Sequence, residues 1–201
     1  EYRRQRQMCI RDRHYVDGGF KELLKHGFSC DNTLITHIPT YTAVGHAGIY
    51  TGSYPALHGI VGNDWYDHET GKTVYCTEDS KAHAVGGSVT AGSMSPRNLW
   101  TTTIGDELRL ATNFTSKVIG ISLKDRGAIL PAGQSANAAF WYDDSTGTMM
   151  SSDYYMKELP GVIRTSVGFT GGTLIDPMLV LTREAAKVGI SLFTLLLIGG
   201  G

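Results

Sequence analysis

The segment Lys117–Leu123 restricts the fold more than any other part of the chain. It reads Lys-Val-Ile-Gly-Ile-Ser-Leu, an almost unbroken apolar run that is typical of a strand buried on both faces. A helical pattern precedes it, and an earlier strand pattern followed by a helical one lies nearer the start of the chain. This alternation predicts an α/β fold with a mostly parallel sheet flanked by helices.

The strongest helical pattern begins at Ser95-Pro96-Arg97-Asn98. We expect one side of this helix to be apolar, with Leu99, Ile104, Leu108 and Ala111. The other side is expected to face water, with Asp106, Glu107 and Arg109.

Weaker patterns predict the remaining local structure. Residues 20–27 indicate a short amphipathic helix that ends at Gly27. Residues 31–38 alternate enough to predict a strand, and residues 43–50 predict a helix. The polar, glycine-rich stretch 81–94 is typical of a surface loop.

Composition excludes several classes of protein. The chain has 201 residues, 41% hydrophobic and 18% charged, which suits a folded domain or part of one. Five arginines lie within residues 1–13, but nothing downstream extends them into a basic face, so no nucleic-acid partner is predicted. No apolar run reaches the roughly 18 residues that a membrane span needs.

Both ends of the sequence look unusual. Residues 1–13 lack apolar periodicity, and we interpret them as a non-native leader, with a genuine basic tail as the alternative. Residues 190–198 are typical of a buried strand, whose sheet neighbours would lie beyond the terminus. We therefore expect residues 14–201 to be part of a larger domain, incomplete at both ends.

Thr42 is the first candidate for chemistry. It lies between Pro39 and a small-residue segment that predicts a helix start, where backbone N–H groups favour negative charge. Its hydroxyl could act as a nucleophile towards phosphate, or Thr42 could simply be the helix N-cap.

Lys124 and Arg126 come directly after the predicted strand 117–123. An ammonium and a guanidinium two residues apart suit a tetrahedral phosphoryl group, although solvated turn charges are the alternative. The Asn63 amide could donate to a phosphoryl oxygen or only shape a turn. Because Thr42 also follows a predicted strand, these side chains are expected to meet at one edge of the sheet.

Other polar residues have simpler interpretations. His46 is expected to be a packed histidine bonded to a backbone carbonyl rather than a base. Asp64, Asp67 and His68 are interpreted as exposed loop residues rather than metal ligands. Cys30 and Cys76 could form a disulfide in an exported protein or remain two small buried thiols.

Three motifs in order resemble the threonine-nucleophile alkaline phosphatases of the alkaline phosphatase superfamily, which also contains the type I phosphodiesterase/nucleotide pyrophosphatases. They are PTYTAVGHAGIYTG at 39–52, HGIVGNDWY at 58–66 and SLKDRGAILPAG at 122–133. The resemblance extends from about His14 to about Pro160.

This resemblance implies roles for individual residues. Thr42 would be the nucleophile that becomes phosphorylated, and Asn63, Lys124 and Arg126 would hold the phosphoryl oxygens. Two zinc ions would assist, with Thr42 as a metal ligand. The two cations also favour phosphate monoesters over diesters, because they match a dianion and fill the space of a second ester arm. Small-molecule phosphate esters would be the substrates.

The resemblance further implies a periplasmic or secreted enzyme, with Cys30 and Cys76 as a candidate disulfide. The family's other zinc ligands have no counterparts in this chain, and even the stretch 193–197 lacks the expected aspartate. Our hypothesis is that the chain is an inactive fragment of an active enzyme. A phosphodiesterase of the same superfamily and a non-catalytic phosphate-binding module are the alternatives, and the sequence does not indicate an oligomeric state.

Overall fold

The computed structural model describes residues 19–30, 33–161 and 163 of this chain. The chain divides into two compact units, Glu1–Thr36 and His37–Gly201. The described part of the first unit contains helix α2, Phe20–His26, which ends at Gly27 as predicted. The predicted leader 1–13, the strand 190–198 and the stretch 193–197 all lie outside the described residues.

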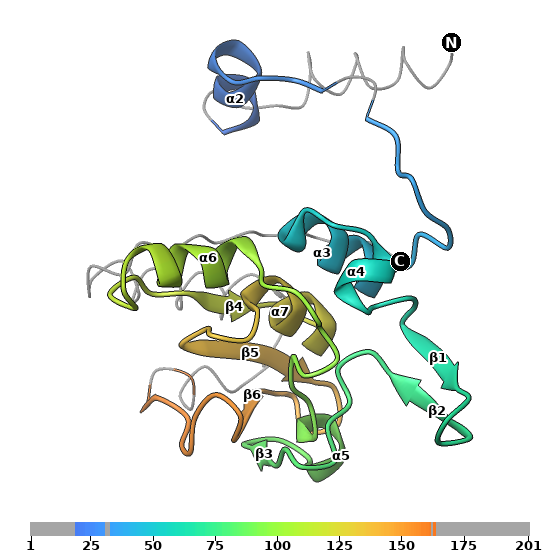
Figure 1. The fold of residues 1–201 in the computed structure, drawn as a ribbon. Coiled ribbons are helices and arrows are strands. Elements are labelled where there is room, and N and C mark those ends of the chain that lie inside the picture. Colours follow the sequence, from blue (N-terminus) through green and yellow to red (C-terminus); the bar gives the residue numbers. More distant parts are fainter. Residues whose placement is uncertain (1–18, 31–32, 162, 164–201) are drawn as a thin grey trace. The chain divides into compact units, whose positions relative to one another are not determined.

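The second unit holds the remaining described elements, which Figure 1 shows in sequence colours. Its helices are α3 (Thr42–Thr51), α4 (Pro55–His58), α5 (Val89–Gly92), α6 (Ile104–Ala111) and α7 (Asp125–Ala132). Its strands are β1 (Asp64–Asp67), β2 (Lys72–Tyr75), β3 (Ala84–Val85), β4 (Ile119–Ile121), β5 (Ala138–Asp143) and β6 (Thr148–Ser152).

The described strands form one mixed four-stranded sheet and a separate hairpin. The sheet has the order β3-β6-β5-β4, in which β4 and β5 are parallel and the other two pairs are antiparallel. The α/β class with flanking helices is confirmed, and among the described pairs the parallel arrangement is limited to β4 and β5. A tight turn that ends at Gly147 explains the antiparallel pairing of β5 with β6. Strands β1 and β2 form the hairpin.

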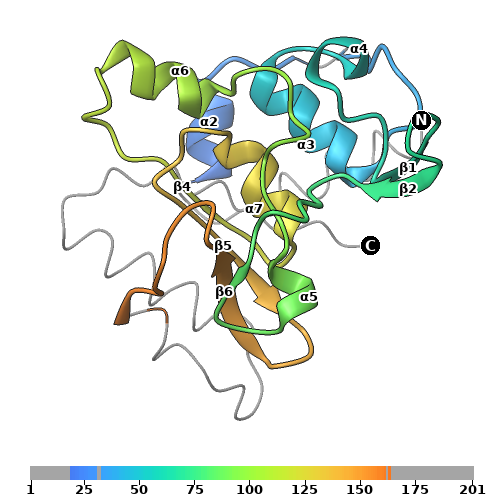
Figure 2. The same cartoon turned by 60° about the horizontal axis from the view of Figure 1, so that its bottom comes forward.

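Helix α7 connects the two parallel strands and packs against both of them and against α3 (Figure 1 and Figure 2). Its Leu130 belongs to an apolar cluster with Ala43 and Ala47 of α3. Its Ala128 and Ile129 belong to a second cluster that faces the sheet. The helix approaches β4 so closely that a Cβ on Gly120 would collide with the Ala128 carbonyl, so glycine is needed there.

Two stretches of the chain differ from the secondary structure predicted for them. Among residues 33–38 there is no strand; Leu34 and Ile38 are 86% and 91% exposed, so the alternating pattern does not mark a paired strand. The predicted loop 81–94 contains the short elements β3 and α5. Strand β4 and helix α3 lie where they were predicted, although β4 is only half-buried.

The helix predicted from Ser95 begins only at Ile104, nine residues later. Thr103 is its N-cap and forms a reciprocal capping box with Asp106, which fixes this start. Leu99 is still buried in the core, but from the loop before the helix. Ile104 and Leu108 are exposed.

Asp106 is buried, not solvent-facing as predicted, and it connects α6 to the end of α7. Its carboxylate accepts hydrogen bonds from Thr103, Gln134 and Ser135, with five donor atoms in all. Burial alone would raise the pKa of this carboxyl, but these hydrogen bonds outweigh it and lower the pKa.

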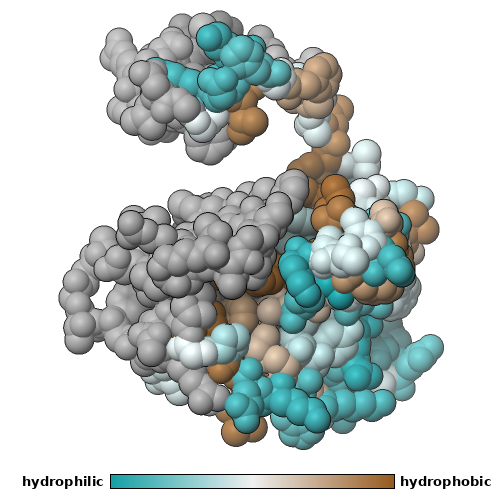
Figure 3. All heavy atoms as spheres, turned by 90° about the vertical axis from the view of Figure 1, so that its left-hand side faces the viewer, coloured by the Kyte–Doolittle hydropathy of each residue, from teal (hydrophilic) through white to brown (hydrophobic). Residues whose placement is uncertain are grey.

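The surface of the described part is mainly polar on one face. Figure 3 shows hydrophilic residues gathered over the lower part of the second unit, with small hydrophobic areas between them. No helix among the described residues is long and apolar enough to cross a lipid bilayer.

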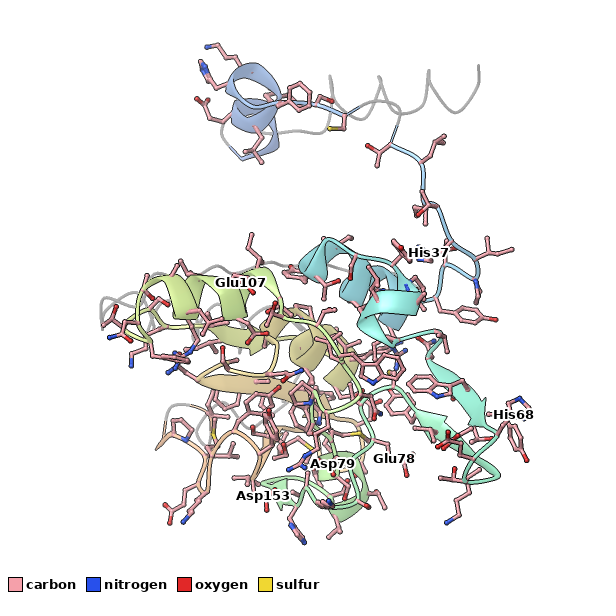
Figure 4. All side chains as sticks on the ribbon, viewed as in Figure 1. His37, His68, Glu78, Asp79, Glu107 and Asp153 are labelled. Atoms are coloured by element: carbon pink, nitrogen blue, oxygen red, sulfur yellow. The ribbon has the colours of Figure 1, made fainter. Side chains whose placement is uncertain are left out.

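We expect Asp106→Asn to lower the free energy of unfolding by about 2–4 kcal/mol, because its new amide N–H groups would face N–H and O–H donors. The adjacent Glu107 is exposed (Figure 4) and bonds only the Thr102 hydroxyl in the described part, so Glu107→Gln should change stability by less than about 0.5 kcal/mol. Urea denaturation of the purified chain measures both.

The difference in stability between wild type and Asp106→Asn should depend on pH. The pKa of Asp106 is lower in the folded chain than its ordinary value of 3.8. Its stabilising contribution is therefore complete above that value and is lost as the pH falls through the folded pKa. The stability gap between wild type and Asp106→Asn should narrow below about pH 4, and a gap independent of pH would contradict the assignment.

Candidate active site

Thr42 is the first residue of α3, and the N-cap position belongs to Tyr41. The backbone of Tyr41 is extended, and its side chain makes no capping hydrogen bond. The alternative in which Thr42 is the N-cap is therefore wrong. The Thr42 side chain is exposed at the positive end of the helix dipole.

Small residues that follow this threonine allow α3 to pack closely against α7. Ala43, Val44 and Ala47 are completely buried. Gly52 adopts a left-handed conformation, with φ of 64°, and ends the helix. The predicted helix is thus anchored firmly enough to hold its first residue in place.

Asn63 contacts the same helix end. Its side-chain Oδ1 accepts a hydrogen bond of 3.1 Å from the backbone N–H of Ala43. This contact satisfies one of the free N–H groups of the helix start and orients the amide. With the oxygen bound to α3, the NH2 group is the end of the side chain that can donate to an anion.

Lys124 and Arg126 lie at the N-terminus of α7. Lys124 is the N-cap residue and is exposed, while Arg126 is half-buried in the first turn. The predicted turn is thus the start of a helix, whose dipole adds to the two positive charges. Arg126 Nη1 donates a hydrogen bond of 2.6 Å to the hydroxyl of Tyr75.

Helix α3 and the first turn of α7 lie close together. His46, one turn after Thr42, lies near the first turn of α7: a Cβ on Gly127 would be 3.7 Å from its Nε2. Burial lowers the pKa of His46, and the nearby charge of Arg126 lowers it further. Its buried Nδ1 has no hydrogen-bond partner among the described residues, so the expected bond to a carbonyl is not formed there.

The structure thus joins Asn63 to the start of α3, where Thr42 lies, and places the first turn of α7, which contains Arg126, near His46 of α3. Lys124 shares the N-terminal turn of α7 with Arg126, and its backbone N–H donates to Ser122 Oγ at 3.4 Å. Thr42 thus lies at the start of α3, and Lys124 and Arg126 lie at the start of α7; their convergence on one anion stays a prediction.

The acidic and histidine residues near Asn63 have local roles. Asp67 accepts hydrogen bonds from Glu69 and Thr70 and closes the hairpin turn. His68 is exposed at this turn and packs edge-on against Tyr66, with ring centroids 5.1 Å apart (Figure 4). Within the described ranges, no three His, Cys, Asp or Glu side chains gather in a group that could hold a metal ion.

The two cysteines of the candidate disulfide are free thiols and lie in different units of the chain. Cys30 is exposed in the first unit, and Cys76 is completely buried in the core of the second. Burial raises the pKa of Cys76 to about 12, and the charge of Asp125 contributes. A thiol held in this way forms little of the thiolate that disulfide exchange needs.

Sequence reasoning missed the groups that support Arg126. Tyr75 and Thr77 both donate hydrogen bonds to Asp125, the neighbour of Arg126 on α7. Some 50 residues of chain separate these partners. The β-branched and aromatic residues of Lys72–Tyr75 after a turn at Gly71 are a strand signal, but nothing in them indicates the partner.

Comparisons with known proteins identify the family. The sequence model described as type I phosphodiesterase / nucleotide pyrophosphatase matches residues 11–180. The chain belongs to this family. It is similar to alkaline phosphatase PhoV of Synechococcus elongatus, with 59% identity over 73% of this chain and 26% of the relative. It is also similar to alkaline phosphatase PafA of Elizabethkingia meningoseptica, with 58% identity over 73% of this chain and 27% of the relative.

The fold is also shared with solved structures. The crystal structure of wild-type PafA matches with a TM-score of 0.73 and 56% identity, over 76% of this chain and 29% of that one. A PafA variant matches with the same TM-score and 48% identity, over 86% of this chain and 32% of that one. Its four substitutions fall on a threonine, an asparagine, a lysine and an arginine. The chain spans about a quarter of the length of the curated relatives it matches.

Two substitutions of Asn63 distinguish the role of its side-chain oxygen from that of its NH2 group. Asn63→Ala removes the acceptor of the Ala43 N–H and should lower the free energy of unfolding by about 1 kcal/mol. Asn63→Asp keeps an acceptor oxygen at a helix N-terminus and should leave stability within about 0.5 kcal/mol of wild type. Chemical denaturation at pH 7 measures both, and equal losses would show that the contact with α3 contributes little.

Proposed function

We propose that this chain supplies the nucleophile and the phosphate-binding groups of a zinc-dependent phosphomonoesterase. The Thr42 oxygen attacks phosphorus as the P–O bond to the ester alcohol breaks, and the alcohol leaves with the proton that the hydroxyl gives up. Water then attacks the phospho-threonine, which releases inorganic phosphate and restores the Thr42 hydroxyl. Two observations support the proposal. Asn63 is hydrogen-bonded to the start of α3, where Thr42 lies, and Arg126 in the first turn of α7 is near enough to His46 of α3 to lower the pKa of that histidine.

The residue types of the PafA variant support these assignments. Threonine, asparagine, lysine and arginine are substituted there in that chain order, with one residue between the last two. Thr42, Asn63, Lys124 and Arg126 have the same types, order and final spacing here.

The chemistry of each group fits its proposed role. The exposed Thr42 hydroxyl lies where the helix dipole favours an alkoxide and the anion it attacks. The Asn63 NH2 group, the Lys124 ammonium and the Arg126 guanidinium donate only, as phosphoryl oxygens require. Together they stabilise the negative charge that spreads over those oxygens during transfer.

Zinc needs ligands beyond Thr42. The described residues, taken alone, do not contain a set of three metal-binding side chains, so we route no step through the metal. We propose that two zinc ions bind in the complete enzyme, here called the parent enzyme, of which residues 14–201 form the N-terminal part. When bound, zinc lowers the pKa of the hydroxyl and water that it holds.

The parent enzyme is further proposed to act on small-molecule phosphate esters in the periplasm or outside the cell. Residues 1–13 are proposed to be foreign to it. Reading the genomic DNA on both sides of this sequence tests both the leader and the parent enzyme.

The purified chain, supplied with zinc, should hydrolyse p-nitrophenyl phosphate no faster than its Thr42→Ala variant. The parent enzyme should hydrolyse it readily, and Thr42→Ala should lower its kcat by at least about a thousandfold, because the covalent step needs the hydroxyl. Zinc-dependent turnover by the chain itself would contradict the fragment hypothesis. A parent enzyme indifferent to Thr42→Ala would contradict the mechanism.

The family description also raises phosphodiester hydrolysis as a second candidate. Substitution of Lys124 distinguishes a phosphomonoesterase from a phosphodiesterase, because a second cation matches a monoester dianion better than a diester monoanion. In the parent enzyme, Lys124→Ala should lower kcat/KM about a hundredfold for p-nitrophenyl phosphate and far less for bis-p-nitrophenyl phosphate. Faster diester than monoester hydrolysis by the wild type would favour the phosphodiesterase.

A further inference from the structure

Tyr75, at the end of the β1–β2 hairpin, contacts two neighbouring side chains of α7 at once. Its hydroxyl accepts a hydrogen bond of 2.6 Å from Arg126 Nη1 and donates one of 3.0 Å to Asp125 Oδ1. The Arg126 guanidinium also lies 6.0 Å from the centroid of the Tyr75 ring.

The direction of these hydrogen bonds is determined by their chemistry. A guanidinium can only donate, so the Tyr75 oxygen must accept from Arg126 and direct its own proton elsewhere. The Asp125 carboxylate accepts a hydrogen bond from the Tyr75 hydroxyl with one oxygen and a hydrogen bond from the Thr77 hydroxyl with the other. Burial, followed by the charge of Asp125, raises the pKa of Tyr75 above its ordinary value, so the hydroxyl keeps its proton at neutral pH.

This contact restrains a side chain that is otherwise flexible. A free arginine loses rotamer entropy when it binds an anion. Here one Nη1 donor is bound to Tyr75, while Nε is buried without a hydrogen-bond partner among the described residues. The guanidinium is thus oriented before any anion arrives, and it keeps donors to spare.

The base of the hairpin ties this arginine to the other phosphate-binding group. Asp64 pairs with Tyr75, and the next residues out are Asn63 and Cys76, joined by a hydrogen bond of 2.8 Å from the Cys76 N–H to the Asn63 carbonyl. Asn98 supports this base by donating to the Tyr75 and Cys76 carbonyls. One short ladder therefore sets Asn63 against α3 and Tyr75 against α7.

We propose that Tyr75 is a positioning residue that holds the Arg126 guanidinium in the orientation that binds a phosphoryl oxygen. The proposal rests on the function proposed above. It assigns to the hairpin β1–β2 the task of setting the distance between the Asn63 and Arg126 donors.

The test is Tyr75→Phe in the parent enzyme, which removes the hydroxyl and keeps the ring in its apolar cluster. We expect kcat/KM for p-nitrophenyl phosphate to fall about tenfold and the inhibition constant of inorganic phosphate to rise by a similar factor. Hydrolysis of bis-p-nitrophenyl phosphate should change by less than about twofold, because it depends less on the paired cations. In an Arg126→Ala background, Tyr75→Phe should have no further effect.

Tyr154→Phe is the matched control. It deletes a hydroxyl that donates to the Gln134 carbonyl, beyond the opposite end of α7, and should leave all of these constants unchanged. Equal losses on both substrates, or additive losses with Arg126→Ala, would overturn the positioning role and indicate a purely structural one. A wild-type parent enzyme inactive on both esters would instead overturn the proposed function.

Discussion

The packing of α7 between the sheet and α3 is the interaction on which the rest of this structure depends. Apolar residues on one side of α7 face the sheet, and Leu130 on the other joins the cluster that contains Ala43 and Ala47. Because α7 follows β4 directly, this packing places the start of α7 beside α3. The Arg126 guanidinium in the first turn of α7 then lies near enough to His46 of α3 to lower the pKa of that histidine.

Hydrogen bonds of two carboxylates, in addition to apolar packing, hold the ends of α7 against neighbouring segments. Asp106 ties α6 to the segment after α7, with donors on every side of its carboxylate. Asp125 does the same at the other end of α7 through Tyr75 and Thr77. Such groups are costly to bury unless all their hydrogen bonds are made, so each one specifies a single arrangement of its neighbours.

Predictions based on local sequence succeeded where the signal was local. The small-residue helix after Thr42 and the apolar strand before Lys124 lie where they were expected. Predictions failed where contacts with residues distant in the sequence determine the local structure or the burial of a side chain. The alternating residues 33–38 have no strand partner in the described part, and Asp106 is buried because Ser135 and Gln134 come from another element. No pattern around Tyr75 could reveal a contact with Arg126, about 50 residues away.

The order and spacing of Thr42, Asn63, Lys124 and Arg126 belong to the sequence, and they were sufficient to suggest phosphate chemistry. Tertiary structure decided how these groups are presented. It bound the oxygen of Asn63 to α3, restrained Arg126 with Tyr75 and converted a presumed turn at Lys124 into a helix start. The physical reason is that charge and hydrogen-bonding capacity are properties of single residues. Their direction is a property of the contacts made when distant segments pack together.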